Sequence, residues 1–154
     1  MVSTLTGLFL KLPDATVDLT PWIHWRLPTI LKQDAAPTDA GPVMVTVEYY
    51  VDAEKVPAFI KAINRYGRIR RRDGAYRWGI FRDLENPDRY LETFLVDSWA
   101  EHLRQHERST RADRVVMEQV QKTTRGEPIV RHLVYATENT VEQVRDHNQR
   151  LTGG

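Results

Sequence analysis

The chain alternates hydrophobic and polar residues over its first regular block, residues 43–52, which predicts a half-buried strand. Over residues 53–72 the hydrophobic positions instead recur every three to four residues, the spacing of a helix that buries one face. Asp73-Gly74 is a turn signal and should end this helix. Alternation returns in residues 75–82 and 89–96, which flank a turn sequence and predict a hairpin.

A second helix is expected after Asp97-Ser98, because either side chain can cap its first turn. Thr110 and Asp113 have the spacing of a capping box, with Asp in the place of the usual Glu, so the helix should break and restart there. Arg125-Gly126 is its expected end. A fourth strand is predicted over residues 129–136.

These elements follow the order strand, helix, strand, strand, helix, strand. This is the order of the ferredoxin-like fold, an α+β fold in which a four-stranded antiparallel sheet carries both helices on one face. We assign this domain to residues 43–137. Residues 1–42 hold five of the eight prolines and are expected to form an extended arm. Residues 138–154 are expected to form a short polar helix and a tail.

Two of the predicted strands carry apolar side chains on both faces. Met44 and Tyr50 lie opposite the alternating valines of the first strand, and Leu91 and Leu95 lie opposite Phe94 in the third. A sheet with one face in water alternates more cleanly than this. Because two helices cover only one face, we expect a second copy of the chain to cover the other.

Composition narrows the possible functions. The 154 residues suit one domain with a core, and the absence of cysteine excludes disulfide scaffolds, thiolate zinc sites and cysteine nucleophiles. No stretch approaches the roughly 18 apolar residues of a membrane span. Residues 1–12 lack the basic leader of a signal peptide, so we expect the chain in the cytoplasm. There is no glycine-rich phosphate loop, and we predict no cofactor.

Positive charge is concentrated in residues 65–82, which carry seven arginines against Asp73. We predict an anionic surface contact, such as lipid headgroups, and expect it to use Arg68, Arg70, Arg71 and Arg72. An ordinary solvated helix end, paired with nearby carboxylates, is the alternative. No nucleic-acid partner is predicted, because no recognition motif accompanies the cluster.

His102 and His106 lie four residues apart and can project from the same side of one helix. This spacing can hold a metal together with a carboxylate, but no third ligand is fixed by spacing, so we predict no metal site. The structural alternative is that His106 makes hydrogen bonds near the helix end and His102 meets solvent.

Three blocks of sequence, residues 43–52, 70–83 and 92–107, resemble the C-terminal cytoplasmic extension of major facilitator superfamily exporters of the enterobactin-exporter-like branch. The resemblance implies a dimeric α/β barrel, the shape of antibiotic-biosynthesis monooxygenases. It also implies a transporter membrane domain as a partner. The membrane helices of these exporters have no counterpart in the sequence, so we expect either a part that follows the last helix or a stand-alone relative.

The monooxygenases of this shape have a Trp and a His on the second helix, facing an aromatic cavity. The resemblance assigns these places to Trp99 and His106, with Trp78, Tyr50 and Phe94 as walls and His102 as a further contact. The alternative is that Trp99 is only a core residue. A neutral histidine in such a cavity could take a proton from a phenol or a quinol that reacts with oxygen.

Two functions therefore remain. The first is a non-catalytic, soluble domain that dimerises with itself, regulates an exporter and senses a small aromatic molecule. The second is a cofactor-independent monooxygenase that uses His106.

Overall fold

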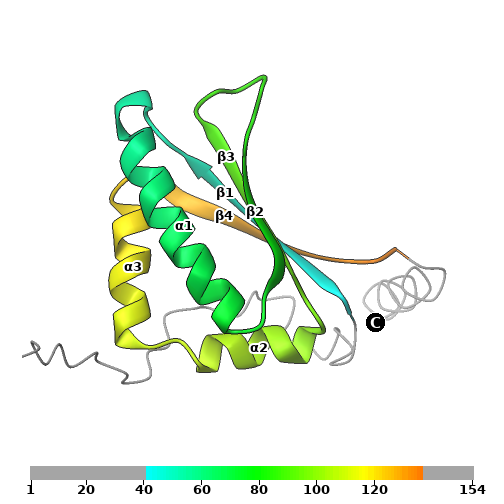
Figure 1. Cartoon of the computed structure of the whole chain (residues 1–154). Coiled ribbons are helices and arrows are strands. Elements are labelled where there is room, and N and C mark those ends of the chain that lie inside the picture. Colours follow the sequence, from blue (N-terminus) through cyan, green and yellow to red (C-terminus); the bar gives the residue numbers. More distant parts are fainter. Residues whose placement is uncertain (1–40, 137–154) are drawn as a thin grey trace, which may run out of the picture.

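Four strands and three α-helices make up residues 41–136, the part of the chain that the computed structural model describes. Figure 1 shows their arrangement. In chain order they are β1 (Val43–Tyr50), the short 3-10 turn η2 (Ala53–Lys55), α1 (Val56–Arg72), β2 (Tyr76–Arg82), β3 (Arg89–Val96), α2 (Trp99–Glu107), α3 (Arg111–Gln121) and β4 (Arg125–Val134). The predicted arm and the predicted C-terminal helix lie outside the described residues.

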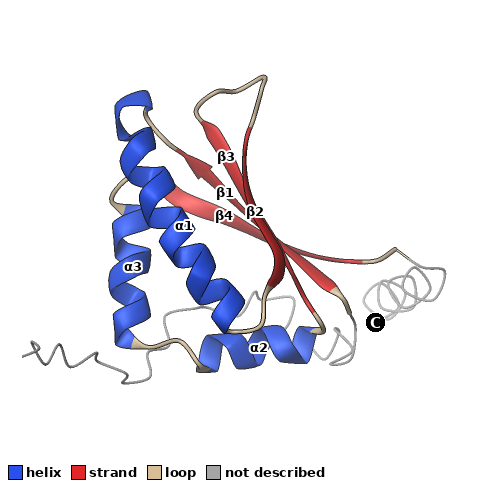
Figure 2. Cartoon of the chain, in the orientation of Figure 1, coloured by secondary structure: helices blue, strands red, loops and turns tan. Residues whose placement is uncertain are grey.

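The strands form one antiparallel sheet in the order β2-β3-β1-β4. All three helices lie on the same face of this sheet, which Figure 2 shows as two layers. The predicted α+β fold with its ferredoxin-like element order is thus confirmed. None of the helices within residues 41–136 is long and apolar enough to cross a bilayer.

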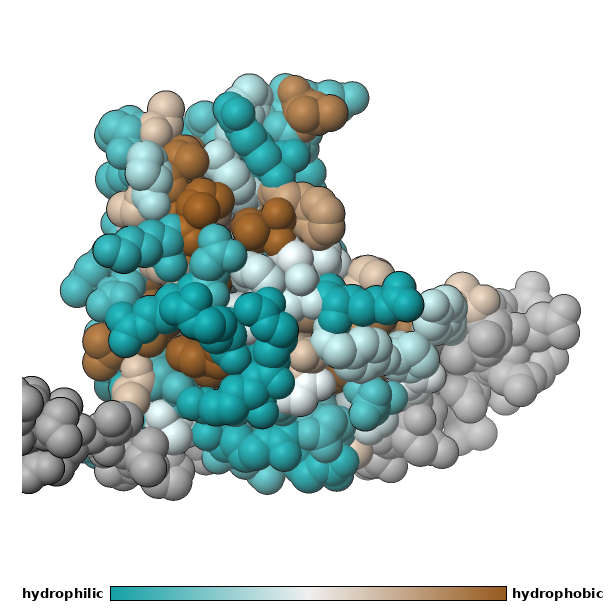
Figure 3. All heavy atoms as spheres, viewed as in Figure 1, coloured by the Kyte–Doolittle hydropathy of each residue, from teal (hydrophilic) through white to brown (hydrophobic). Residues whose placement is uncertain are grey.

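The core lies between α1 and the inward face of β1 and β3. Phe59 of α1 is fully buried, and its ring centroid lies 5.5 Å from that of Tyr49 and 5.1 Å from that of Tyr90. Burying a side chain of this size contributes about 1.5–3 kcal/mol, so these contacts fix α1 on the sheet. The outer surface of the helices is mostly hydrophilic in Figure 3, as expected of a layer that faces water.

The predicted break in the second helical segment is confirmed. The Ser98 hydroxyl accepts a hydrogen bond from the backbone N–H of Glu101 and begins α2. Thr110 and Asp113 form the complete capping box that begins α3. The break lets α2 and α3 follow different directions (Figure 1). Both helices contribute side chains to the cavity above the sheet.

Two predicted boundaries are wrong. The fourth strand begins at Arg125 and ends at Val134, earlier than predicted, because α3 already ends at Gln121. Gly126, predicted to be a helix stop, lies instead in the strand with φ +65°. The carboxylate of Asp52, before the 3-10 turn, pairs with Lys55 and with Arg125 at the start of β4.

The sheet face away from the helices carries one apolar row and one mixed row, in which Glu48 pairs with Arg89 and Arg131. Register places Tyr76, Leu95, Met44 and Leu133 side by side across all four strands. A second row consists of Phe81, Leu91, Glu48 and Ile129. Opposed residues of antiparallel strands share one face, so these rows lie opposite the buried valines of β1.

Candidate functional site

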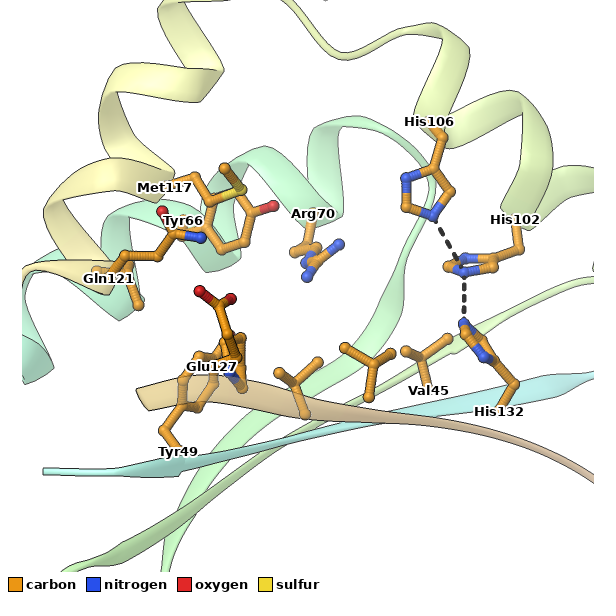
Figure 4. Close-up of a pocket in the computed structure, with 14 residues that line it drawn as sticks. Val45, Tyr49, Tyr66, Arg70, His102, His106, Met117, Gln121, Glu127 and His132 are labelled. Carbon is orange, nitrogen blue, oxygen red and sulfur yellow. Dashed lines mark hydrogen bonds between the residues drawn. The ribbon is translucent and has the colours of Figure 1, made fainter. Parts of the chain in front are cut away.

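A cavity of about 230 Å³ lies between the helices and the sheet. Its apolar walls come from β1, α3 and β4, and include Val47, Val120 and Val130. Its polar end is formed by Arg70, His102, His106 and His132 (Figure 4). The rest of the lining is Val45, Tyr49, Tyr66, Met117, Gln121, Glu127 and Pro128. A small apolar cavity with a few converging polar groups is the usual form of a ligand site.

Three histidine rings form a chain at the polar end. His102 Nε2 lies 3.2 Å from His106 Nε2 and 3.0 Å from His132 Nε2 (Figure 4). His102 and His106 are one turn apart on α2, and His132 comes from β4. A neutral ring nitrogen has either one proton or one lone pair, so His102 Nε2 cannot donate to one neighbour and accept from the other. Adding a proton or a polar ligand would therefore change the hydrogen bonds among the three histidine rings.

Burial keeps two of these rings neutral. His102 is only 2% exposed, and burial, followed by the nearby His132 and Arg70, lowers its pKa to about 3. Burial and then Arg70 lower the pKa of His132 as well. The ring of Trp99 packs against both, with centroid distances of 5.4 and 5.2 Å. Near pH 7 both imidazoles are therefore uncharged and can accept a proton or a hydrogen bond.

Acidification from pH 7 to pH 5 is expected to lower the free energy of unfolding by about 2 kcal/mol through His102 alone. The folded pKa of about 3 lies below the unfolded value of about 6.5, so the unfolded chain takes up a proton first. This contribution to stability is complete above pH 6.5 and is lost as the pH falls towards 3. Urea unfolding at pH 7, 6 and 5 measures it.

The His102→Asn variant is the control for this effect. It should lose the part of the slope between pH 7 and pH 5 that belongs to His102, about 2 kcal/mol, and keep the part that belongs to His132, whose pKa is also lowered. An unchanged slope would mean that His102 carries no lowered pKa in the folded chain.

Arg70 enters the cavity from α1 and is held on three sides. Its Nε lies 3.4 Å from Glu92 Oε1, and its guanidinium carbon lies 4.5 Å from the Tyr66 ring and 4.7 Å from the Phe94 ring. Burial opposes its charge, but Tyr66 and Glu92 outweigh burial and raise the pKa of Arg70 above its ordinary value. Arg70 is therefore a fixed cation inside the fold.

Glu92 is the anion that balances Arg70. It is 0% exposed, although it lies on β3, and it also accepts hydrogen bonds from the Tyr49 hydroxyl at 2.9 Å and from Trp78 Nε1 at 2.8 Å. Trp78 reaches it because β2 has a bulge between Tyr76 and Gly79, where Arg77 has φ +49°. Such a bulge redirects the following side chain, here towards the core.

The structure brings together only part of the predicted ligand site. His102 and His106 line the cavity, and the prediction that His102 meets solvent is wrong. Trp99 and Phe94 are buried behind the histidines and Arg70, and neither lines the cavity.

Two further predicted walls lie elsewhere, which corrects their placement. Trp78 packs beside Gly67 and beneath the guanidinium of Arg71. Tyr50 lies on the opposite face of the sheet, where its hydroxyl donates to Glu48, because it alternates with the inward Tyr49.

The predicted anionic contact surface is also divided. Arg70 points into the cavity, so it does not belong to a surface with Arg71 or Arg72. Arg72 is bound to Asp73 and Asp113, and Arg71 lies 5.0 Å from the Trp78 ring centroid. Exposed Arg68 lines a separate hollow with Arg72, and lipid binding by this outer group stays a prediction.

Sequence reasoning missed three residues of the site. Glu92 interrupts the apolar inward positions of β3, and a charge at such a position is the signal of a buried partner. His132 likewise lies between Val130 and Val134 on the inward face of β4 and interrupts its apolar positions. The role of Arg70 had no local signal, because it lies within a run of arginines. Within residues 41–136 no group of side chains is arranged to hold a metal ion.

Solved structures with a similar fold come from several organisms. A candidate antibiotic biosynthesis monooxygenase from Caulobacter crescentus CB15 has a TM-score of 0.56 and 18% identity, covering 65% of this chain and 94% of that one. A conserved protein from Methanosarcina mazei Go1 has a TM-score of 0.55 and 18% identity, covering 64% and 96%. A protein from Mycobacterium tuberculosis has a TM-score of 0.52 and 16% identity, covering 64% and 98%. At these identities the likeness concerns the fold alone.

The comparison with curated proteins gives no match. At the level of families, the model of the transmembrane secretion effectors, within the major facilitator superfamily, matches residues 1–140. This match covers most of the chain and includes all of the described elements. The chain therefore belongs to the transmembrane secretion effector family.

Proposed function

We propose that the chain is a regulatory domain associated with an exporter of this family, that it works as a homodimer in the cytoplasm, and that it binds a small apolar or aromatic molecule in its cavity. Membership of the transmembrane secretion effector family supports the link to export. The observation that carries the proposal is the two-sided sheet, which has a ligand-sized cavity on one face and exposed apolar side chains on the other.

The apolar face suits a second copy of the chain. Leu133 is 47% exposed, and Met44 and Phe81 are exposed as well, although they belong to regular strands. A groove of about 420 Å³ runs along this face beside Met44, Leu95 and Leu133. Two copies related by a two-fold axis would each offer the same rows to the other, which is the usual geometry of a homodimer.

The Leu133→Glu variant tests the dimer. We expect its dimer dissociation constant to rise by about 100-fold or more, because closing the interface would bury an unpaired carboxylate. Analytical ultracentrifugation over a range of concentrations measures this. The matched control is Val115→Glu, which places the same charge on exposed α3 at a site 52% accessible and should leave the constant unchanged. Wild-type protein that stays monomeric at all concentrations would contradict the proposal.

The cavity supports the binding of a small molecule. Its apolar walls offer a place for one ring, and the three histidines and Arg70 offer polar contacts at one end. Because its walls come from α2, α3 and the sheet, a ligand there would alter how these helices pack on the sheet. Such a change in helix packing would couple ligand binding in the cavity to a membrane domain.

The alternative function, a monooxygenase, rests on His106. His106 lines the cavity and is within hydrogen-bond distance of the neutral His102, as a proton acceptor for a phenol or quinol would require. Oxygen uptake with a hydroquinone, lost in His106→Ala but retained in Arg68→Gln, would support this alternative. Binding of ligands without oxygen uptake would support the sensing role.

A further inference from the structure

The terminal nitrogens of Arg70 are the most unusual polar groups of the cavity. The only hydrogen bond of this side chain within the described residues runs from Nε to Glu92. The side chain is nevertheless only 18% exposed, and its guanidinium carbon lies 4.5 Å from the centroid of the Tyr66 ring and 4.7 Å from that of the Phe94 ring. Nη1 and Nη2 therefore offer several N–H donors at the edge of the guanidinium plane, and Arg70 lines the cavity (Figure 4).

Glu92 binds Arg70 through Nε and does not occupy the two terminal nitrogens. Glu92 shares its two oxygens among three donors, which are Arg70 Nε, the Tyr49 hydroxyl and Trp78 Nε1. Glu92 therefore holds the guanidinium at Nε, and Nη1 and Nη2 of Arg70 remain available to a ligand in the cavity. A planar fork of this kind matches the two oxygens of a carboxylate.

The surroundings favour one negative charge on the ligand. His102 and His132, held neutral by burial, add ring nitrogens beside Arg70 without adding charge. Glu127 and Gln121 are exposed residues of the lining, so the carboxylate of Glu127 disfavours a second negative charge there. The volume of about 230 Å³ has room for a single ring, roughly eight to twelve non-hydrogen atoms when compared with the volume of liquid water.

We infer that the cavity selects small monocyclic carboxylic acids in their anionic form, with the carboxylate bound by Nη1 and Nη2 of Arg70 and the ring held between the valines of β1, α3 and β4. This inference rests on the proposed ligand-binding function and names its chemical class. The carboxylate would replace water at a cation that the fold already shields from most of the solvent, so less further desolvation is required than at an exposed arginine.

Benzoate and benzamide form the test, because they have the same shape and differ in charge. Isothermal titration calorimetry at pH 7 and physiological salt should give a dissociation constant at least tenfold lower for benzoate. The double variant Arg70→Gln, Glu92→Gln removes both members of the buried pair and should bind the two compounds equally. A thermal melt of this variant establishes that it is folded. Arg70→Lys, which keeps the charge without the fork, should lose part of the preference.

The control variant is Arg68→Gln, which removes an exposed arginine outside the cavity and should keep the full preference. Equal binding of benzoate and benzamide by the wild type would overturn the inference and leave the proposed ligand-binding function standing. Binding of neither compound would overturn both. A preference that disappears in Arg68→Gln would place the anion on the outer arginines and overturn the inference as well.

Discussion

Replacing Glu92 with Gln is expected to lower the free energy of unfolding by about 3–5 kcal/mol, the usual effect of removing one partner of a buried ion pair. Arg70 would remain inside the fold beside the Tyr66 and Phe94 rings, without the carboxylate that balances its charge. The amide of Gln would also offer one acceptor oxygen where Glu92 now serves Tyr49 and Trp78 from two. Urea unfolding at pH 7 measures the loss.

Two further variants separate this effect from a general cost of the substitution. Glu118→Gln makes the same chemical change at an exposed ion pair with Arg114 and should alter stability by less than about 1 kcal/mol. The double variant Arg70→Gln, Glu92→Gln should be more stable than Glu92→Gln alone, because it removes the unbalanced charge as well. If the double variant loses the full sum of the two single effects, Arg70 and Glu92 do not act as a pair.

The fold was accessible from the sequence because its signals are local. Alternation in residues 43–50, helical spacing in residues 56–72 and the hairpin turn at residues 83–88 each depend on neighbours in the chain. The capping box at Thr110 was found for the same reason. The mistaken start of β4 came from Gly126, which suits a helix end but here occupies a strand with positive φ.

The candidate site was less accessible because it is assembled from distant segments. His102 and His132 are thirty residues apart, and Arg70 and Glu92 are twenty-two apart, so only the packed fold shows that they meet. The aromatic residues were predicted as cavity walls, and this was wrong for another reason. Trp99 and Phe94 support the site from behind, and the bulge in β2 turns Trp78 towards Glu92, which no local pattern indicates.

The sheet face with exposed apolar side chains falls between these two cases. The apolar residues on both sides of β1 and β3 are visible in the sequence, and the structure places Met44, Leu95 and Leu133 in one row. Sequence periodicity indicates that a face is apolar, but it does not identify the surface that covers it. That step needs the dimer measurement on Leu133→Glu.

Asp113→Ala is expected to lower the free energy of unfolding by about 2–3 kcal/mol, because one side chain performs two roles. Asp113 accepts hydrogen bonds from the backbone N–H of Thr110 at 2.9 Å and from its hydroxyl at 2.8 Å, which begin α3. It also accepts two from Arg72, at 3.1 and 2.9 Å, which tie α3 to the end of α1. Burial raises the pKa of Asp113, but the bonds from Arg72 and Thr110 outweigh it and lower the pKa overall.

Asp113→Asn separates the two roles, since its amide oxygen can still accept the hydrogen bonds from Thr110 but it carries no charge for Arg72. It should lose about 1 kcal/mol, less than the Ala variant. Asp88→Ala, which removes an exposed partner of Arg125, should lose less still. Hydrogen exchange should show faster opening of α3 in Asp113→Ala, with β1 and β3 protected as before. Because α3 supplies Met117 and Val120 to the cavity, the Asp113→Ala variant should also weaken the binding of a ligand there. Unchanged hydrogen exchange in α3 would contradict this role for Asp113.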